Sequence, residues 1–142
     1  PNSSKTKCQK KPGFSWSNFA MANEIKVQTT LTVTNGSLRY SNTETHNADQ
    51  AQAEGPTPGT LSIGTTYEAI TLNDLNNNGI CEVTNLDDAN FVEIGLEVSS
   101  TFYPFMRLKP GETYVLRLSP GVSYFAKADT AAVSLKMLVF GD

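Results

Sequence analysis

NFVEIGLEV, at residues 90–98, is the stretch of sequence that decides the fold. Its apolar residues fall on every second position from Val92 to Val98, and Glu93 and Glu97 fall between them. Successive side chains of a β-strand point to opposite faces, so this alternation is typical of a strand with one buried face. No stretch of the chain has a convincing helical period. We therefore predict an all-β fold.

The same period of two recurs along most of the chain. It predicts further strands at residues 24–34, 66–72, 79–85, 101–108, 113–118, 124–128 and 132–140. Turn residues separate these segments, and Pro-Gly pairs are the clearest of them. We predict a jelly-roll-like β-sandwich of about eight or nine short antiparallel strands, formed by residues 21–142.

The first predicted strand, at residues 24–34, should be half-buried, with Ile25, Val27 and their alternate neighbours facing inward. Asn35-Gly36 follows it and is a strong hairpin signal. Residues 38–40 can begin a return strand, but the alternation then fades. We expect the polar residues 41–59, which include two prolines, to form a long exposed loop.

The charge of the chain is unevenly distributed. The net charge is −3, but residues 1–20 contain four lysines and no acid, whereas the rest contains seven basic and fourteen acidic side chains. We predict that residues 1–20 form an extended arm that contacts a partner protein. Its candidate contact residues are Lys5, Lys7, Lys10, Lys11, Phe14, Trp16 and Phe19. An acidic protein surface fits this arm better than nucleic acid, because phosphate would be repelled by the acidic body. Met21 resembles a translation start, so residues 1–20 could also be an upstream extension.

Several classes of function find no support in the composition. No run approaches the ~20 apolar residues that a membrane-spanning helix needs. Cys8 and Cys81 have no spacing typical of a metal site, and we interpret them as free thiols. No cofactor-binding glycine motif is present, and we expect no cofactor.

One segment resembles half of a calcium-binding loop. Asp74, Asn76 and Asn78 occupy alternate positions before Gly79, as oxygen ligands do in an EF-hand, with Glu82 nearby. The position that normally supplies a bidentate glutamate is Asn85, and the flanking residues predict strands rather than helices. A plain turn explains the same residues, and we expect no metal.

Candidate catalytic residues are few. Asp87 and Asp88 could form an acid–base pair, but they lie in a predicted turn, where such side chains bond to their own backbone. His46 is the only histidine, and no placed serine or cysteine accompanies it. We interpret it as a solvated loop residue, and we expect the protein not to be an enzyme.

The second half of the chain resembles a known class of protein. The resemblance rests on NLDDANFVEIG at residues 85–95, FMRLKPGE at 105–112, VLRL at 115–118 and YFAKA at 124–128. These residues, and less strongly residues 21–38, are similar to small β-rich virion proteins of tailed bacteriophages. The resemblance implies a non-enzymatic capsid cement or decoration protein, trimeric, on the capsid surface of virions assembled in the host cytoplasm. Its implied partner is the major capsid protein or another virion protein.

Two other functions remain open from the sequence. One is a tail, neck or head-fibre component of the virion. The other is a carbohydrate-binding module or adhesin, for which β-sandwiches are common scaffolds. This last function predicts that exposed aromatic residues line a groove, and the candidates are Tyr40, Tyr67, Tyr103 and Tyr124.

Overall fold

The computed structural model describes residues 23–50, 53–72 and 75–142, which form ten β-strands. The strands are, in chain order, β1 (Ile25–Asn35), β2 (Leu38–Ala48), β3 (Thr57–Ile63), β4 (Glu68–Ile70), β5 (Asn78–Asn85), β6 (Val92–Val98), β7 (Thr101–Leu108), β8 (Thr113–Arg117), β9 (Tyr124–Ala128) and β10 (Val133–Gly141). All their pairings are antiparallel. The predicted all-β fold is confirmed, with ten strands in place of eight or nine.

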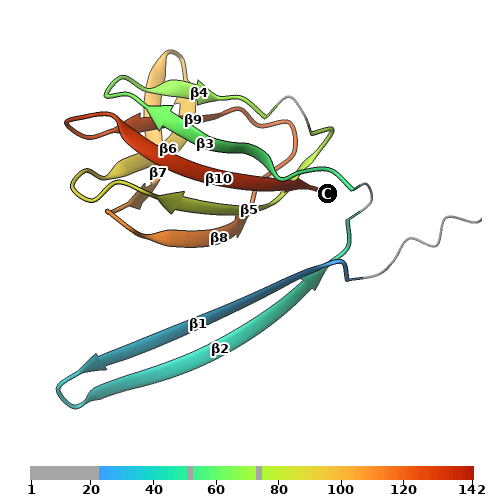
Figure 1. Ribbon diagram of the computed structural model, residues 1–142, viewed down its shortest axis with the longest axis vertical. Coiled ribbons are helices and arrows are strands. Elements are labelled where there is room, and N and C mark those ends of the chain that lie inside the picture. Colours follow the sequence, from blue (N-terminus) through green and yellow to red (C-terminus); the bar gives the residue numbers. More distant parts are fainter. Residues whose placement is uncertain (1–22, 51–52, 73–74) are drawn as a thin grey trace, which may run out of the picture.

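Eight of the strands form a sandwich of two four-stranded sheets (Figure 1). One sheet has the order β3-β10-β5-β8, and the other has the order β4-β9-β6-β7. The pairing is nested, because β6 pairs with β7, β5 with β8, β4 with β9 and β3 with β10. Successive nested pairs belong to alternate sheets. The chain from β3 to β10 is therefore a long hairpin, closed at β6–β7 and rolled up on itself.

The core lies between the two sheets and is built from the inward positions of the alternating strands. In β10 the buried residues Val133, Leu135, Met137 and Val139 alternate with more exposed ones. In β6 the alternation predicts four inward residues, but only Val92 and Ile94 are fully buried, and Val98 is 57% exposed. A β-bulge between Ile94 and Gly95 shifts the register with β7. The last residues of β6 therefore leave the core and form an exposed hairpin with the start of β7.

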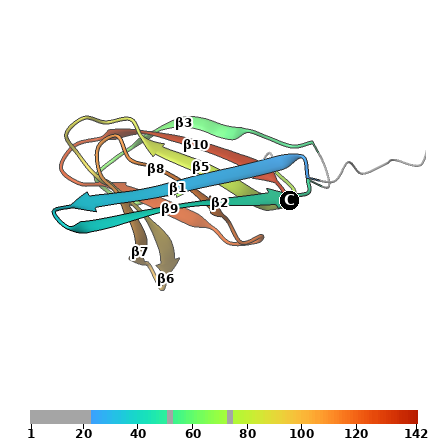
Figure 2. The same cartoon turned by 90° about the horizontal axis from the view of Figure 1, so that it is seen from below.

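The remaining two strands form a separate hairpin, which we call the ribbon (residues 25–48). β1 pairs only with β2, from Ile25 opposite Ala48 to Asn35 opposite Leu38. The ribbon leaves one end of the sandwich and projects away from it (Figure 1), and seen from below it runs along the sandwich's length (Figure 2). Its strands make few contacts with the strands of the sandwich.

The structure overturns the long loop predicted at residues 41–59. β2 continues as far as Ala48, and β3 begins at Thr57. The polar residues of β2 were mistaken for a loop because this strand buries neither face. Its sequence therefore lacks the apolar alternation that predicts a strand. The half-burial predicted for the first strand is also wrong for most of its length, since Leu31 is 57% exposed. His46 lies in β2 opposite Val27, exposed but not in a loop.

Other element boundaries differ less from the prediction. β7 and β9 match their predicted ranges, β5 and β8 differ by one residue at one end, and β10 differs by one residue at both ends. The strand predicted at residues 66–72 shortens to Glu68–Ile70, which pairs only with β9 at the edge of its sheet. The ribbon turn has Gly36 and Ser37 as its central residues, one position later than Asn35-Gly36.

Candidate functional site

The ribbon presents two chemically different faces. Side chains opposite each other on two antiparallel strands share a face. The pairing therefore places Leu31, Val33, Leu38 and Tyr40 together on one face near the tip. Of these, Leu31 and Leu38 are both 57% exposed and Tyr40 is 50% exposed. We call these four residues the apolar tip.

The opposite face of the ribbon carries hydroxyl groups. Thr30 Oγ1 lies 2.9 Å from Thr43 Oγ1, and Thr32 Oγ1 lies 3.3 Å from Ser41 Oγ, so the pairs are hydrogen-bonded across the strands. Cross-strand threonine pairs stabilise a sheet without a core beneath them. They account for a long ribbon that keeps its register while leaving its apolar face uncovered.

Hydrogen bonds anchor the base of the ribbon to the sandwich. The backbone amide of Gln50 donates to Glu24 Oε2 at 3.1 Å, and the Gln50 side chain donates to the carbonyl of Glu54 at 2.7 Å. The same Glu54 carbonyl accepts a hydrogen bond from Gly141 of β10 at 3.0 Å. The carboxylate of Glu54 accepts from the backbone and side-chain amides of Asn76. Glu54 thus connects the ribbon base, β10 and the segment before β5.

A groove of about 430 Å³ separates the base of the ribbon from the outer face of the sandwich. Ile25 and Val27 line its ribbon side, and Ile80, Val115 and Phe140 are among the residues on its sandwich side. Ile25 and Val27 are half-buried here, in contrast to the apolar tip. The ribbon is therefore supported near its base and unsupported near its tip.

A second apolar surface lies where the edge strands β7 and β8 face each other. A cavity of about 260 Å³, which we call the edge notch, is lined by Leu96, Phe105, Leu116, Arg117, Leu118, Ser119, Val122 and Tyr124. Phe105 is 52% exposed and packs edge-on against the buried ring of Tyr124. Arg117 is the notch's one charged lining residue, and it forms an ion pair with Asp142. The notch therefore favours an apolar occupant.

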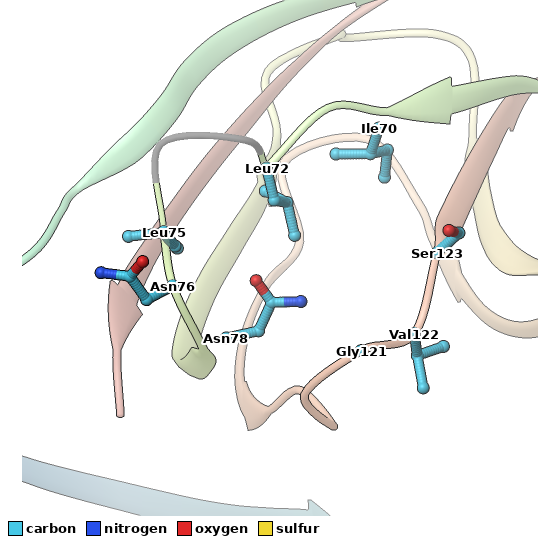
Figure 3. A pocket seen from close by; sticks show the side chains of 8 residues that line it. All are labelled: Ile70, Leu72, Leu75, Asn76, Asn78, Gly121, Val122 and Ser123. Atoms are coloured by element: carbon cyan, nitrogen blue, oxygen red, sulfur yellow. The ribbon is translucent and has the colours of Figure 1, made fainter.

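The calcium-like segment borders a pocket of about 540 Å³ at one end of the sandwich (Figure 3). Asp74 lies outside the described residues. Asn78 points into this pocket, whereas Asn76 turns away from it and bonds to Glu54 (Figure 3). Glu82 lies farther along β5, where it forms an ion pair with Lys136 at 2.7 Å. The three described candidates therefore do not converge, as calcium ligands must. Within residues 23–50, 53–72 and 75–142 no group of three His, Cys, Asp or Glu side chains is placed to hold a metal ion.

Asp87 caps the turn between β5 and β6. Its Oδ1 accepts hydrogen bonds from the backbone amides of Ala89 at 2.8 Å and Asn90 at 2.6 Å. These bonds favour the charged form and lower the pKa of Asp87. The prediction that this aspartate bonds to its own turn is confirmed. Its neighbour Asp88 is exposed in the same turn.

Cys81 is a buried residue of the core. Burial, with a smaller contribution from the charge of Glu82, raises the pKa of its thiol to about 12. The thiol is therefore protonated near neutral pH and is a poor nucleophile. The free-thiol interpretation is confirmed for Cys81, and Cys8 lies outside the described residues.

The four tyrosines proposed for a sugar-binding groove are not brought together. Tyr40 lies on the ribbon and Tyr103 on β7, and both are exposed. Tyr67 stacks on Phe102 at 5.5 Å between ring centroids. Tyr124 is buried, and its hydroxyl accepts a hydrogen bond from the backbone amide of Ser119.

The seven arm residues that sequence reasoning chose, Lys5, Lys7, Lys10, Lys11, Phe14, Trp16 and Phe19, all lie outside the described residues. Sequence reasoning missed the apolar tip and the edge notch. The signal for the tip was available, because Leu31 and Val33 alternate before a strong turn signal and Leu38 and Tyr40 alternate after it, so a tight turn places them on one face. No comparable signal exists for the notch, since it depends on two strands from different sheets.

Comparison with known proteins adds no relative, since no protein-family model, curated protein or solved structure matches the chain. Within the described part of the chain, no helix has the length and apolar character needed to cross a membrane. Among the described residues, the apolar tip and the edge notch both present exposed apolar side chains.

Proposed function

We propose that this protein is a non-enzymatic structural component of a larger protein assembly. The observation that carries the proposal is the ribbon, whose apolar tip is exposed and distant from the core. An isolated two-stranded hairpin is at best marginally stable in water. Exposed apolar clusters of this kind mark protein–protein contacts. A sandwich that holds such a ribbon outward is suited to contact a neighbouring protein.

The specific form of the proposal is a capsid cement protein of a tailed bacteriophage, bound across joints between major capsid proteins. The resemblance of residues 85–142 to small phage virion proteins supports it. The charge of the chain also supports it, because a basic arm attached to an acidic body can bind two different neighbours. A ribbon and an arm that engage separate subunits would combine their affinities and strengthen the joint. A tail, neck or head-fibre position is the alternative within the virion.

Mass spectrometry and immunogold labelling of purified particles from the source of the chain test this function. We expect the protein in stoichiometric amounts, with labels over the head, and we expect recombinant protein to rebind particles from which it was stripped. Labels over the tail would favour the alternative position. Absence from particles, combined with binding to a glycan array, would favour the carbohydrate-binding function instead.

A further inference from the structure

The apolar tip and the edge notch are two uncovered apolar surfaces of the same chain. The tip offers Leu31, Leu38 and Tyr40 at half exposure or more, and the notch offers Phe105 beside Leu96. Figure 1 shows the ribbon held apart from its own sandwich. The hydrogen bonds of Gln50 and Glu54 fix the ribbon at its base. The tip is thus available to a surface outside its own chain.

We propose that the occupant of the edge notch is the apolar tip of a second copy of this chain. Each copy then supplies one ribbon and one notch. In a two-fold pair or a closed ring, every notch holds the tip of another copy and no tip is left uncovered. This inference goes beyond the proposed function, because self-association can succeed or fail independently of binding to a capsid.

Charge favours an apolar contact between copies. Residues 49–142 contain five basic and twelve acidic side chains, so two sandwiches repel each other over most of their surface. The ribbon, residues 25–48, contains two basic side chains and one acidic side chain, so its net charge of +1 is opposite in sign to that of the sandwich. The notch has one charged lining residue, Arg117, already paired with Asp142. Ribbon and notch can therefore meet with little electrostatic cost.

The contact that this exchange makes is small. The apolar tip spans residues 31–35 and 38–42, so its face is about 17 Å long and about 10 Å wide. A reciprocal exchange covers two such faces and the two notches beneath them, about 700 Å² in total. This area is below that of permanent dimers, so we expect a weak self-association that depends on concentration.

Disulfide trapping between two different variants tests the contact directly. Both variants carry Cys8→Ser, so that Cys81, buried with a raised pKa, is the only native thiol. One carries Tyr40→Cys at the tip. The other carries Tyr103→Cys, which lies opposite Leu96 of the notch. On mild oxidation of the mixture we expect the mixed disulfide to form several-fold faster than either homodimer.

The matched control replaces Tyr40→Cys with Thr32→Cys, on the hydroxyl face of the same ribbon. It should give little mixed disulfide. Equal trapping by the control, or trapping only between two Tyr40→Cys copies, would overturn the proposal.

A chain that carries both Tyr40→Cys and Tyr103→Cys tests closure within one copy. A disulfide that forms in this chain as a monomer, at a rate independent of concentration, would also overturn it. Light scattering on the unmodified protein then gives the number of copies in the closed assembly.

Discussion

At the scale of single residues, Asn85 is a buried polar residue of the sandwich whose side chain and backbone are both hydrogen-bonded. It is fully buried, and its side chain donates to the carbonyls of Asn90 at 2.9 Å and Leu108 at 3.2 Å. Its Oδ1 accepts from the amide of Asp87 at 3.0 Å. The backbone of Asn85 also bonds to the turn between β7 and β8, through Gly111 and Glu112. This one residue therefore joins the β5–β6 turn to the β7–β8 turn, both of which cross from one sheet to the other.

Replacing Asn85 should therefore be costly. Asn85→Ala leaves two buried carbonyls and one amide without their partner, and each such group costs about 1–3 kcal/mol. We expect the free energy of unfolding to fall by about 2–4 kcal/mol, measured by denaturant unfolding. Thr84→Ala, at the half-buried neighbouring position where one hydroxyl pair with Thr113 is lost, is the control and should cost well under half as much. A loss no larger than that of the control would contradict the bonding described.

Asp87 gives a pH-dependent contribution to stability. Its pKa is lowered in the folded protein, so the contribution is present above the ordinary value of 3.8 and is lost as the pH falls through the folded value. We expect Asp87→Asn to lower Tm at pH 7, and the difference from the unmodified protein to shrink below pH 3.8. Asp88→Asn, which removes a charge from the same turn, should not reproduce this pH dependence.

At the scale of the elements, glycines act in two distinct ways. Gly95 of β6 lies at the register shift with β7, where an added Cβ would collide with the carbonyl of Tyr103 and lie 2.8 Å from Cα of Pro104. Gly36 has open space around it but a φ of +57°, which other residues rarely adopt. The first position excludes a side chain by contact, and the second disfavours one by conformation.

The two replacements should have separable effects. Gly95→Ala should lower the stability of the sandwich by about 3 kcal/mol or more, because backbone must move to admit the methyl group. Gly36→Ala should cost about 1–2 kcal/mol, confined to the ribbon. Hydrogen exchange distinguishes them, since only ribbon amides should lose protection in Gly36→Ala. Loss of protection in β10 in that variant would show that ribbon and sandwich unfold together.

The sequence predicted β1 and most strands of the sandwich, but it missed most of β2 and all of β3. β9 was predicted to the residue because its buried and half-buried residues alternate, and β7 because its aromatic-rich run ends at a Pro-Gly turn. β2 was missed because solvent on both sides imposes no pattern, and its threonine and asparagine residues resemble a loop. The bonding of Asp87 was predictable because it is local. The bonds of Glu54 and the notch were not, since they join segments distant in sequence. The two four-stranded antiparallel sheets confirm the predicted all-β sandwich.

At the scale of the whole molecule, the sandwich contains the buried core that stabilises the fold, and the ribbon carries the surface proposed for interaction. The buried apolar residues belong almost entirely to the sandwich, and Ala48 at the end of β2 is the one ribbon residue among those described as buried. Ile25 and Ala48 face each other at the ribbon base. A short link between residues 24 and 49 can therefore replace the ribbon.

Replacing residues 25–48 with two glycines should leave the sandwich folded. We expect its Tm to change by a few degrees at most, because the ribbon makes few contacts with the sandwich strands. The same variant should lose self-association and assembly binding. Circular dichroism melting and light scattering measure the two properties. Unfolding of the variant at room temperature would show that the ribbon is part of the folding unit.

The ribbon's independence has a consequence for how such a protein can diverge. Because its side chains alternate with a period of two, adding or removing two residues in each strand preserves which face every remaining side chain occupies. Each such step lengthens or shortens the ribbon by about 6.6 Å, and no core residue has to change. Natural variants should therefore differ in ribbon length by even numbers per strand while the sandwich keeps its dimensions. The same protein body could in this way be matched to neighbours at different spacings.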